Sequence, residues 1–311
     1  SGRANGIFSR NYGIGALSVT ASWTVTGTDG RGIYAQNLGT AGTSLTIAAA
    51  AVTGRTEGIR ADNSGTGALS VTTTGTVSGT GTNGRGIAAF NSSTGTSLTI
   101  SAAAVSGGID GISADNRGTG ALTVTSTGAV TGTSGAGIFA RNVSTSTSLT
   151  ISAAAVTGAT EGIYASNYGT GTLSVTVSGA VAGGTGAGIS TQSNAGGAVA
   201  IRLLSTSSVT ATSGAAIVDG VGNAVVTIDA GAVVTGSIAL GDGSDTLIGG
   251  LGFNRILGGR GADHIVGGIG KDILVAGPGN DKVLGGGGED EVDGGLGSDG
   301  IEVPGNSVIV R

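Results

Sequence analysis

The chain has no cysteine and no methionine, only two prolines, and few aromatic residues: four Phe, four Tyr and one Trp in 311 residues. Without cysteine there is no disulfide framework, so stability has to come from packing or from a bound ion. No apolar run is long enough to cross a bilayer, which predicts no membrane span. Arginine and lysine form no basic tract, so the sequence predicts no binding of nucleic acid.

Glycine is abundant, with 66 residues, but it does not follow the G-X-Y period of collagen. Glycine, serine and threonine instead alternate with regularly spaced Val, Leu and Ile, a pattern typical of many short strands joined by tight turns. Charge is uneven along the chain. Residues 1–239 carry 9 Arg against 8 acidic residues, whereas residues 240–311 carry 11 acidic residues against 5 basic ones. The net negative charge therefore belongs to the last quarter of the chain.

Residues 1 to about 235 repeat about every 26 residues, with the anchor G-I-x-A-x-N. Each repeat holds this segment and two further short segments that alternate apolar and polar residues, and each such segment predicts a strand. Three short strands per repeat are typical of one triangular coil of a parallel β-helix. The anchor isoleucines are Ile7, Ile33, Ile59, Ile87, Ile112, Ile138 and Ile163, with degraded copies at Ile189 and Ile217.

The asparagine of the anchor shares a face with the isoleucine and the alanine, because side chains alternate with period two along a strand. We assign that face to the interior. A buried amide is tolerated when it is hydrogen-bonded, so each asparagine should bond to the turn that follows and to the asparagine of the next coil. The row comprises Asn11, Asn37, Asn63, Asn91, Asn116, Asn142 and Asn167. We expect it to be structural rather than a ligand site.

Seven nonapeptides with the pattern G-G-x-G-x-D-x-U-x, where U is a large aliphatic residue, run from Leu240 to Glu302. A carboxylate every nine residues, among glycines that leave backbone carbonyls accessible, is a ligand array for a hard cation such as Ca²⁺. The sixth positions, our candidate metal ligands, are Asp245, Asn254, Asp263, Asp272, Asp281, Asp290 and Asp299.

These nonapeptides resemble the haemolysin-type (RTX) calcium-binding repeat of secreted bacterial proteins, and the long repeat resembles the right-handed β-helix of pectate lyases and autotransporter passenger domains. The first resemblance implies that Ca²⁺ lies between repeats n and n+2, whose loops share one side of a β-roll, and that folding depends on calcium. The implied pairs are Asp245 with Asp263, Asn254 with Asp272, Asp263 with Asp281, Asp272 with Asp290, and Asp281 with Asp299.

The sequence therefore predicts an all-β fold. A right-handed parallel β-helix of about nine coils of about 26 residues spans residues 1–236, and it continues into a calcium-binding parallel β-roll over residues 237–311. No linker-like stretch separates the two parts, so we expect one joined rod.

Two other functions were weighed against a structural role. Similar combinations of β-helix and RTX roll occur in alginate epimerases and polysaccharide lyases, but the recurring acids Glu57, Asp110 and Glu161 are two coils apart. That spacing is about 10 Å, too far for paired-carboxylate chemistry, and we expect no enzymatic activity and no catalytic residues. An adhesin shaft is the second alternative. Four aromatic residues share the outward position after the anchor isoleucine and form an interrupted stripe for glycans: Phe8, Tyr34, Phe139 and Tyr164.

We expect a secreted or cell-surface structural protein of bacterial type, stabilised by Ca²⁺. The chain opens at Ser1 in mid-repeat, which indicates a piece of a longer precursor, and an uncapped first coil exposes a strand edge that recruits other edges. The expected partners are therefore copies of the same chain, joined end to end in a filament or surface layer, and extracellular glycans in the adhesin alternative.

Overall fold

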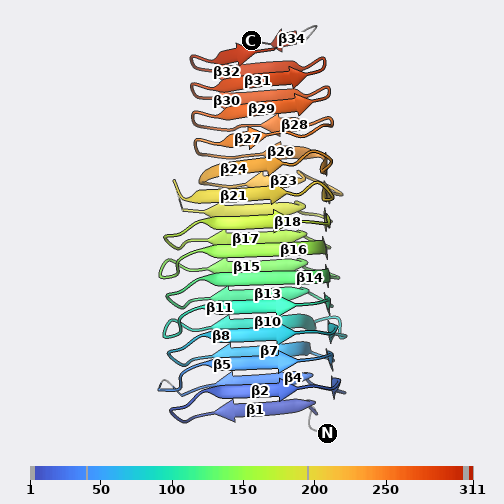
Figure 1. Cartoon of the computed structure of the whole chain (residues 1–311), viewed down its shortest axis with the longest axis vertical. Helices are drawn as coiled ribbons and strands as arrows, with labels where there is room; N and C mark the ends of the chain where they lie inside the picture. The colour runs from blue at the N-terminus through green and yellow to red at the C-terminus, as the bar shows by residue number, and fades with distance from the viewer. Residues whose placement is uncertain (1–3, 40, 195, 304–307, 311) are drawn as a thin grey trace.

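The computed structural model describes residues 4–39, 41–194, 196–303 and 308–310. Within this part the chain winds into a single rod made of strands and turns, with its two termini at opposite ends (Figure 1). Neighbouring coils pair in parallel and in register, so that Ile7 pairs with Ile33 and Ile33 with Ile59. The expected parallel β-solenoid is confirmed.

The first face of the rod is a 14-stranded sheet that runs along its full length. The anchor segments form its first nine strands. In order along the rod, the sheet consists of β1 (Ile7–Asn11), β4 (Ile33–Asn37), β7 (Glu57–Asn63), β10 (Arg85–Asn91), β13 (Ile112–Asn116), β15 (Ile138–Asn142), β17 (Ile163–Asn167), β20 (Ile189–Ser193), β23 (Ile217–Asp219), β26 (Ser237–Ala239), β28 (Arg255–Leu257), β30 (Ile273–Pro278), β32 (Glu291–Leu296) and β34 (Val308–Val310).

The second face also extends through both parts of the chain. Its strands are β2 (Leu17–Ala21), β5 (Leu45–Ala49), β8 (Leu69–Thr73), β11 (Leu98–Ala102), β14 (Leu122–Gly132), β16 (Leu149–Gly158), β18 (Leu173–Val177), β21 (Ala198–Leu203), β24 (Asn223–Ile228), β27 (Thr246–Ile248), β29 (His264–Ile269), β31 (Lys282–Gly287) and β33 (Gly300–Glu302). Strands β14 and β16 continue around a corner into the third face, which joins the second and third faces into one 20-stranded sheet.

The third face is the shortest. Besides the ends of β14 and β16 it consists of β3 (Val25–Gly27), β6 (Val52–Gly54), β9 (Val77–Gly79), β12 (Val105–Gly107), β19 (Ala180–Gly183), β22 (Ser208–Ala211) and β25 (Val233–Thr235). After β25 the coils have two strands each. The step between paired residues falls to 21 from Ile217 to Ile238, a coil that still has three strands, and to 18 from Ile238 to Ile256, a coil with two. The division of the chain at residue 236 and the right-handed winding stay predictions.

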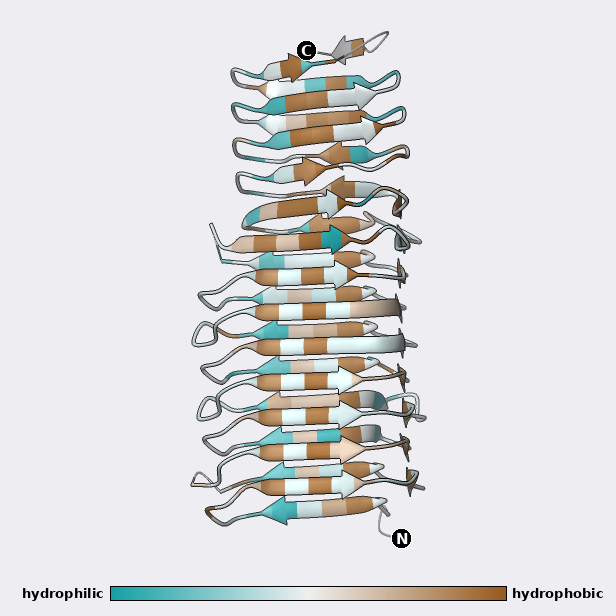
Figure 2. Ribbon diagram, viewed as in Figure 1, coloured by the Kyte–Doolittle hydropathy of each residue, from teal (hydrophilic) through white to brown (hydrophobic). Residues whose placement is uncertain are grey.

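One continuous core runs inside the rod, because each strand buries its alternate apolar side chains. The alternation of hydrophobic and more hydrophilic residues along the strands can be followed in Figure 2. Ile33, Leu45 and Val52 come from the three faces of one coil and are fully buried. The close packing also explains the glycine before each anchor isoleucine: a Cβ on Gly32 would collide with Cγ1 of Val52. In the roll, the eighth-position aliphatic residues from Leu247 onward continue the same core.

The asparagine row forms the predicted ladder at the corner after the first face. Each amide nitrogen donates to the amide oxygen of the next asparagine, at 2.9 Å from Asn63 to Asn91 and again from Asn91 to Asn116. The same nitrogens also bond to carbonyls of the following turn, for example Asn63 to Gly67 at 3.0 Å. Asn37 through Asn167 are buried. The structural interpretation of these residues is thus confirmed.

Candidate metal centre

The loops of the roll require glycine for two reasons. Gly261 and Gly270 have φ values of +135° and +140°, which strain any residue with a side chain. Each loop also lies directly against the loop two repeats away, so that a Cβ on Gly261 would collide with the carbonyl of Gly243. The glycine pattern therefore produces two stacks of closely spaced loops, one on each side of the roll.

The structure places the predicted ligands in two buried rows. Asp245 is 1% exposed and Asp272 is completely buried, while Asp299, the last of the row, is half-buried. Among the described residues, Asp245, Asp263, Asp272, Asp281 and Asp299 form no ion pair with a basic side chain. Burying unpaired carboxylates is costly, so the fold of the roll has to provide other partners.

One carboxylate oxygen of each pair is satisfied by backbone. In every predicted pair, the residue of the earlier loop donates its N–H to Oδ1 of the later loop. The distances are 2.9 Å from Asp245 to Asp263, 2.7 Å from Asn254 to Asp272, 2.8 Å from Asp263 to Asp281, 3.0 Å from Asp272 to Asp290, and 3.0 Å from Asp281 to Asp299. The structure thus brings all five predicted pairs together.

The second carboxylate oxygen is different. Oδ2 of Asp245, Asp263, Asp272 and Asp281 is buried and has no hydrogen-bond partner in the described structure. A buried anionic oxygen without a donor costs about 1–3 kcal/mol or more. The unpartnered oxygens repeat at the same place in successive loops, and this arrangement suits a bound cation.

The pKa values of these carboxyl groups are raised, because burial disfavours their charged form. Burial raises the pKa of Asp245 to about 7, although the N–H of Ala224 opposes the change and the charges of Asp263 and Asp219 add to it. Burial also raises the pKa of Asp272, against the hydrogen bonds from Asn254 and with the charge of Asp290. A cation between the loops would neutralise this repulsion and remove the cost of keeping the carboxylates charged.

A hard divalent cation fits these residues. Carboxylate oxygens are the ligands that Ca²⁺ prefers, together with backbone carbonyls. Groups of three or more His, Cys, Asp or Glu side chains suitable for a metal do not occur in the described residues. The backbone carbonyls of the loops would therefore have to supply most of the ligands, as the glycine content allows. Asn254 carries an amide in place of a carboxylate and donates to Gly252 O at 2.7 Å, so its site has one negative charge fewer.

One feature of the row was missed in the sequence. The backbone ladder continues one loop before the nonapeptides, where Ala224 N–H donates to Asp245 Oδ1 at 2.7 Å. The spacing of 21 residues hides this loop from a search with period nine.

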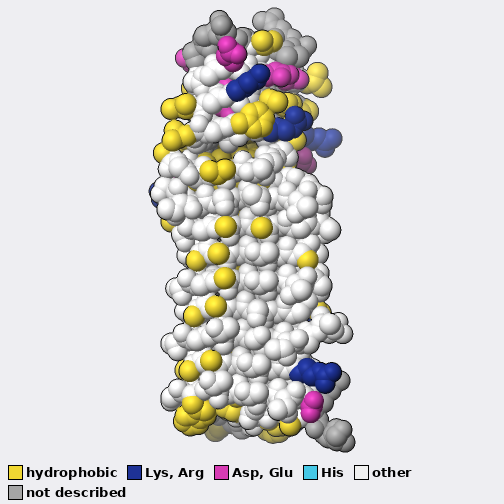
Figure 3. Space-filling view, turned by 90° about the vertical axis from the view of Figure 1, so that its right-hand side faces the viewer, with side chains coloured by type: hydrophobic (Ala, Val, Ile, Leu, Met, Phe, Trp, Pro, Cys, Tyr) yellow, Lys and Arg dark blue, Asp and Glu magenta, His cyan; other side chains and the backbone are white. Residues whose placement is uncertain are grey.

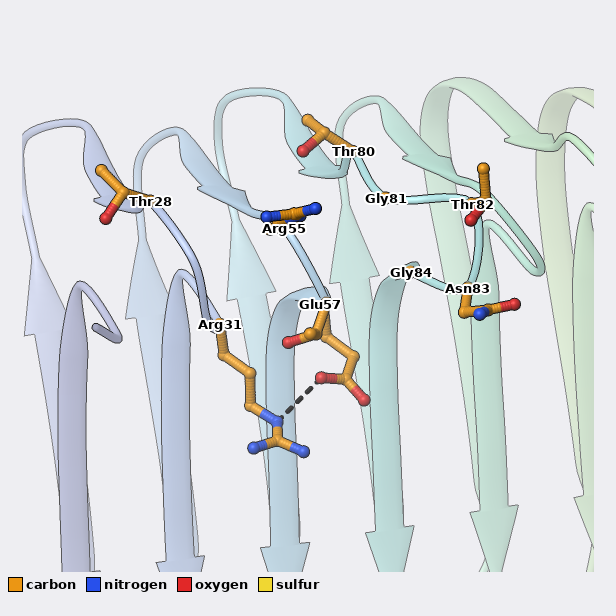
Figure 4. A pocket seen from close by; sticks show the side chains of 10 residues that line it. Thr28, Arg31, Arg55, Glu57, Thr80, Gly81, Thr82, Asn83 and Gly84 are labelled. Carbon is orange, nitrogen blue, oxygen red and sulfur yellow. Dashed lines mark ion pairs between the residues drawn. The ribbon is translucent and has the colours of Figure 1, made fainter. Parts of the chain in front are cut away.

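A surface hollow of about 780 Å³ lies on the β-helix, between turns of successive coils (Figure 4). Arg31 points toward Glu57 there, with Nε 2.8 Å from Oε2. The other labelled residues are threonines, glycines, Asn83 and Arg55. Among the described residues that line the hollow, Glu57 is the only one with a carboxylate, so they do not include the paired acids of glycoside hydrolysis.

The aromatic stripe is divided into two separate pairs. The rings of Phe139 and Tyr164 are stacked, with their centroids 5.1 Å apart and their planes 9° apart. The ring centroids of Phe8 and Tyr34 are 5.3 Å apart, with the planes tilted by 34°. Between the pairs, the same register position is occupied by Arg60, Ala88 and Ser113. Arg31 and Arg10 lie over the rings of the first pair.

Comparison with known families identifies the roll. The family described as RTX calcium-binding nonapeptide repeat (4 copies) matches residues 241–274 and 266–301, which is the segment that carries the buried carboxylate rows. No curated protein and no solved structure matches the chain significantly. The chain is thus a parallel β-solenoid that carries RTX calcium-binding repeats.

Proposed function

We propose that this chain is a calcium-stabilised structural rod that works outside the cell and associates end to end into a filament or surface layer. Two findings support a calcium-dependent role outside the cell: the RTX repeats and the unpartnered carboxylate oxygens. The described residues contain no helix long and apolar enough to span a membrane. Extracellular calcium modules work at dissociation constants of about 10⁻⁴–10⁻³ M.

The distribution of exposed apolar side chains along the rod is the observation that supports the assembly proposal. In the described part of the chain, large apolar residues that are strongly exposed occur only in the first coil and from Val225 onward. Those of the first coil are Phe8, Tyr12, Ile14 and Trp23. Figure 3 shows the same distribution on one face, where charged and larger hydrophobic side chains gather toward the ends and the middle is mostly uncharged. Exposed apolar residues toward both ends, with none of the strongly exposed large ones on the described coils between them, favour contact between the ends of different copies.

The strands of the first coil also support association between ends. Strands β1, β2 and β3 pair with β4, β5 and β6 on one side, and their other side has no strand partner in the described residues. Backbone groups of a strand that have no strand partner are a template for another strand. A contact between the first coil of one copy and the last coil of another is heterologous, so it propagates into a filament instead of closing.

Substitution of Ser18 by proline tests this assembly. Leu17 N–H donates to Ser44 O of the second coil at 2.9 Å, so by alternation Ser18 N–H faces away from the second coil. Proline at Ser18 removes that donor, and an edge strand tolerates it. We expect Ser18→Pro to remain as single rods in millimolar calcium while the wild type forms filaments, as measured by sedimentation velocity and negative-stain microscopy.

Ser18→Ala is the matched control, because it keeps the N–H and should form filaments like the wild type. Filaments of Ser18→Pro that match the wild type would contradict the proposed edge. A wild type that stays monomeric at high concentration with calcium would contradict end-to-end assembly altogether.

A glycan-binding shaft is a second candidate, favoured by the stacked Phe139–Tyr164 pair. Aromatic rings contribute about 0.5–1.5 kcal/mol beyond their buried area. If the shaft binds glycans, replacing both Tyr34 and Tyr164 by alanine should weaken retention on a glycan array about tenfold or more and leave filaments intact. Tyr168→Ala, outside both ring pairs, serves as the control. Equal retention by all variants, or none by the wild type, would count against this function.

A further inference from the structure

The loop from Asp219 to Ala224 lies before the nonapeptides but has their backbone conformation. Gly222 has φ of +137°, close to the +135° of Gly261 in the repeats. Gly222 N–H donates to Asp242 O at 3.1 Å, as Gly243 N–H donates to Arg260 O at 2.8 Å. The loop therefore stacks on the loop of residues 241–245 as the repeat loops stack on one another.

The carboxylate of this loop stands at a different position. In register with the motif, Asp219 takes the first position, where most repeats have glycine, and Ala224 takes the sixth, where the repeats have Asp or Asn. The loop thus keeps one acidic residue, moved by five positions. Because Ala224 lacks a carboxylate, a search for the nonapeptide pattern passes over it.

The repeats show where a first-position side chain points. A Cβ on Gly258 would lie 2.7 Å from Oδ2 of Asp263, and a Cβ on Gly267 would lie 2.6 Å from Oδ2 of Asp272. The first position of a loop therefore faces the space that holds the sixth-position Oδ2 of the same loop. With alanine at position 224, that space is open to the carboxylate of Asp219.

Asp219 is buried in the same way as the carboxylates of the repeats. Its side chain is 2% exposed, its Oδ1 accepts a hydrogen bond from the Thr191 hydroxyl at 2.6 Å, and its Oδ2 is buried without a hydrogen-bond partner. Oδ2 of Asp245 in the next loop is also unpartnered, and the charge of Asp219 adds to the rise in the pKa of Asp245. The carbonyl oxygens of Asp219 and Gly220 both face Gly241 of that loop.

We propose that Asp219 and Asp245 bind a further Ca²⁺ between the loop of residues 219–224 and the loop of residues 241–245, with backbone carbonyls of both loops as the remaining ligands. This site rests on the proposed calcium binding of the roll. There, in the same way, one Ca²⁺ lies between the loop that carries Asp245 and the loop that carries Asp263. The ion links the last coil of the β-helix to the first turn of the roll.

The test compares calcium binding by the full chain and three variants. Asp219→Asn keeps an oxygen for the Thr191 hydroxyl and loses the anionic Oδ2. Asp219→Gly combined with Ala224→Asp moves the carboxylate to the motif position. Asp229→Asn is the control, because Asp229 belongs to the same coil and pairs with Arg202 at 3.1 Å, outside the calcium loops. The number of bound Ca²⁺ ions is counted by native mass spectrometry, and the midpoint of calcium-induced folding is followed by circular dichroism.

We expect Asp219→Asn to bind one ion fewer than the wild type, with the remaining ions retained. The double variant should regain that ion, and Asp229→Asn should bind as many ions as the wild type. Equal ion numbers and equal midpoints for the wild type and Asp219→Asn would overturn the junction site while leaving the roll sites standing. If Asp219→Asn does not fold, a double variant that folds but lacks the ion would also overturn it. A wild type that binds no calcium would instead overturn the proposed function.

Discussion

In EDTA, residues 240–302 lose most of their protection against amide hydrogen exchange, and the strands before Gly220 keep theirs. This is the expected result because the buried carboxylates of the roll repel one another without a cation, and glycine-rich loops lose more conformational entropy on folding than other chains. A site filled at one hundred times its dissociation constant contributes about 2.7 kcal/mol to the folded state. Several such sites exceed the stability of a small domain, so we expect a cooperative loss, measured peptide by peptide by mass spectrometry.

Two comparisons make this experiment specific. Mg²⁺ should restore little protection, since it requires near-ideal octahedral geometry and gives up its water reluctantly. Asp272→Asn should raise the calcium concentration needed for folding, whereas Asp242→Asn should not, because Asp242 is exposed and lies outside the sixth position. Exchange in the roll that is the same with EDTA as with calcium would show that these repeats do not bind it.

Replacing Asn91 by leucine should destabilise the middle of the β-helix by about 2 to 4 kcal/mol. Asn91 is fully buried, donates to Thr96 O at 3.0 Å and to Asn116 Oδ1 at 2.9 Å, and accepts a hydrogen bond from Asn63. Leucine has the same branching and the same number of side-chain heavy atoms as asparagine, but it leaves these groups without their partner in a place that water does not reach. We expect a lower urea midpoint and faster exchange in the coils on either side.

The position of the asparagine along the row sets the size of this effect. Asn11 is only half-buried and bonds to a single neighbouring asparagine, so Asn11→Leu should cost less than Asn91→Leu. Thr99→Ala, on the exposed side of β11 in the same coil as Asn91, should leave the midpoint within about 0.5 kcal/mol of the wild type. If the two asparagine variants are equally stable, the ladder is not what holds these coils in register.

Much of this architecture can be predicted from the sequence, because the solenoid repeats its physical requirements in every coil. The anchor isoleucine and asparagine, such as Ile33 and Asn37, return in each coil. In a parallel stack held in register, each of them lies next to its counterpart in the neighbouring coil. The carboxylate pairs followed from the resemblance to the RTX repeat. Their hydrogen bonding could not be predicted in this way. Oδ1 of Asp263 accepts a backbone N–H while Oδ2 has no partner, and this difference depends on loop geometry that the residue pattern does not contain.

The intermediate turn between the two parts could not be predicted from the sequence. The third face ends at β25 and the coil shortens in two steps, through an intermediate turn of 21 residues that has neither repeat length. Sequence periodicity identifies positions only while the period is constant. Asp219 lies in this interval, so its buried side chain could be recognised only from the structure.

The direction of the hydrogen bonds in this rod determines how it responds to force. Strands run around the axis, so the bonds between coils lie along it, and a pull on the two ends loads one pair of coils after another. Each β-helix coil adds only about 4.8 Å to the length of the rod, yet it stores about 26 residues, which extend to roughly 85 Å when released. A filament built from such rods would lengthen stepwise under tension and absorb work at each coil, with calcium concentration setting the resistance of the roll at its end.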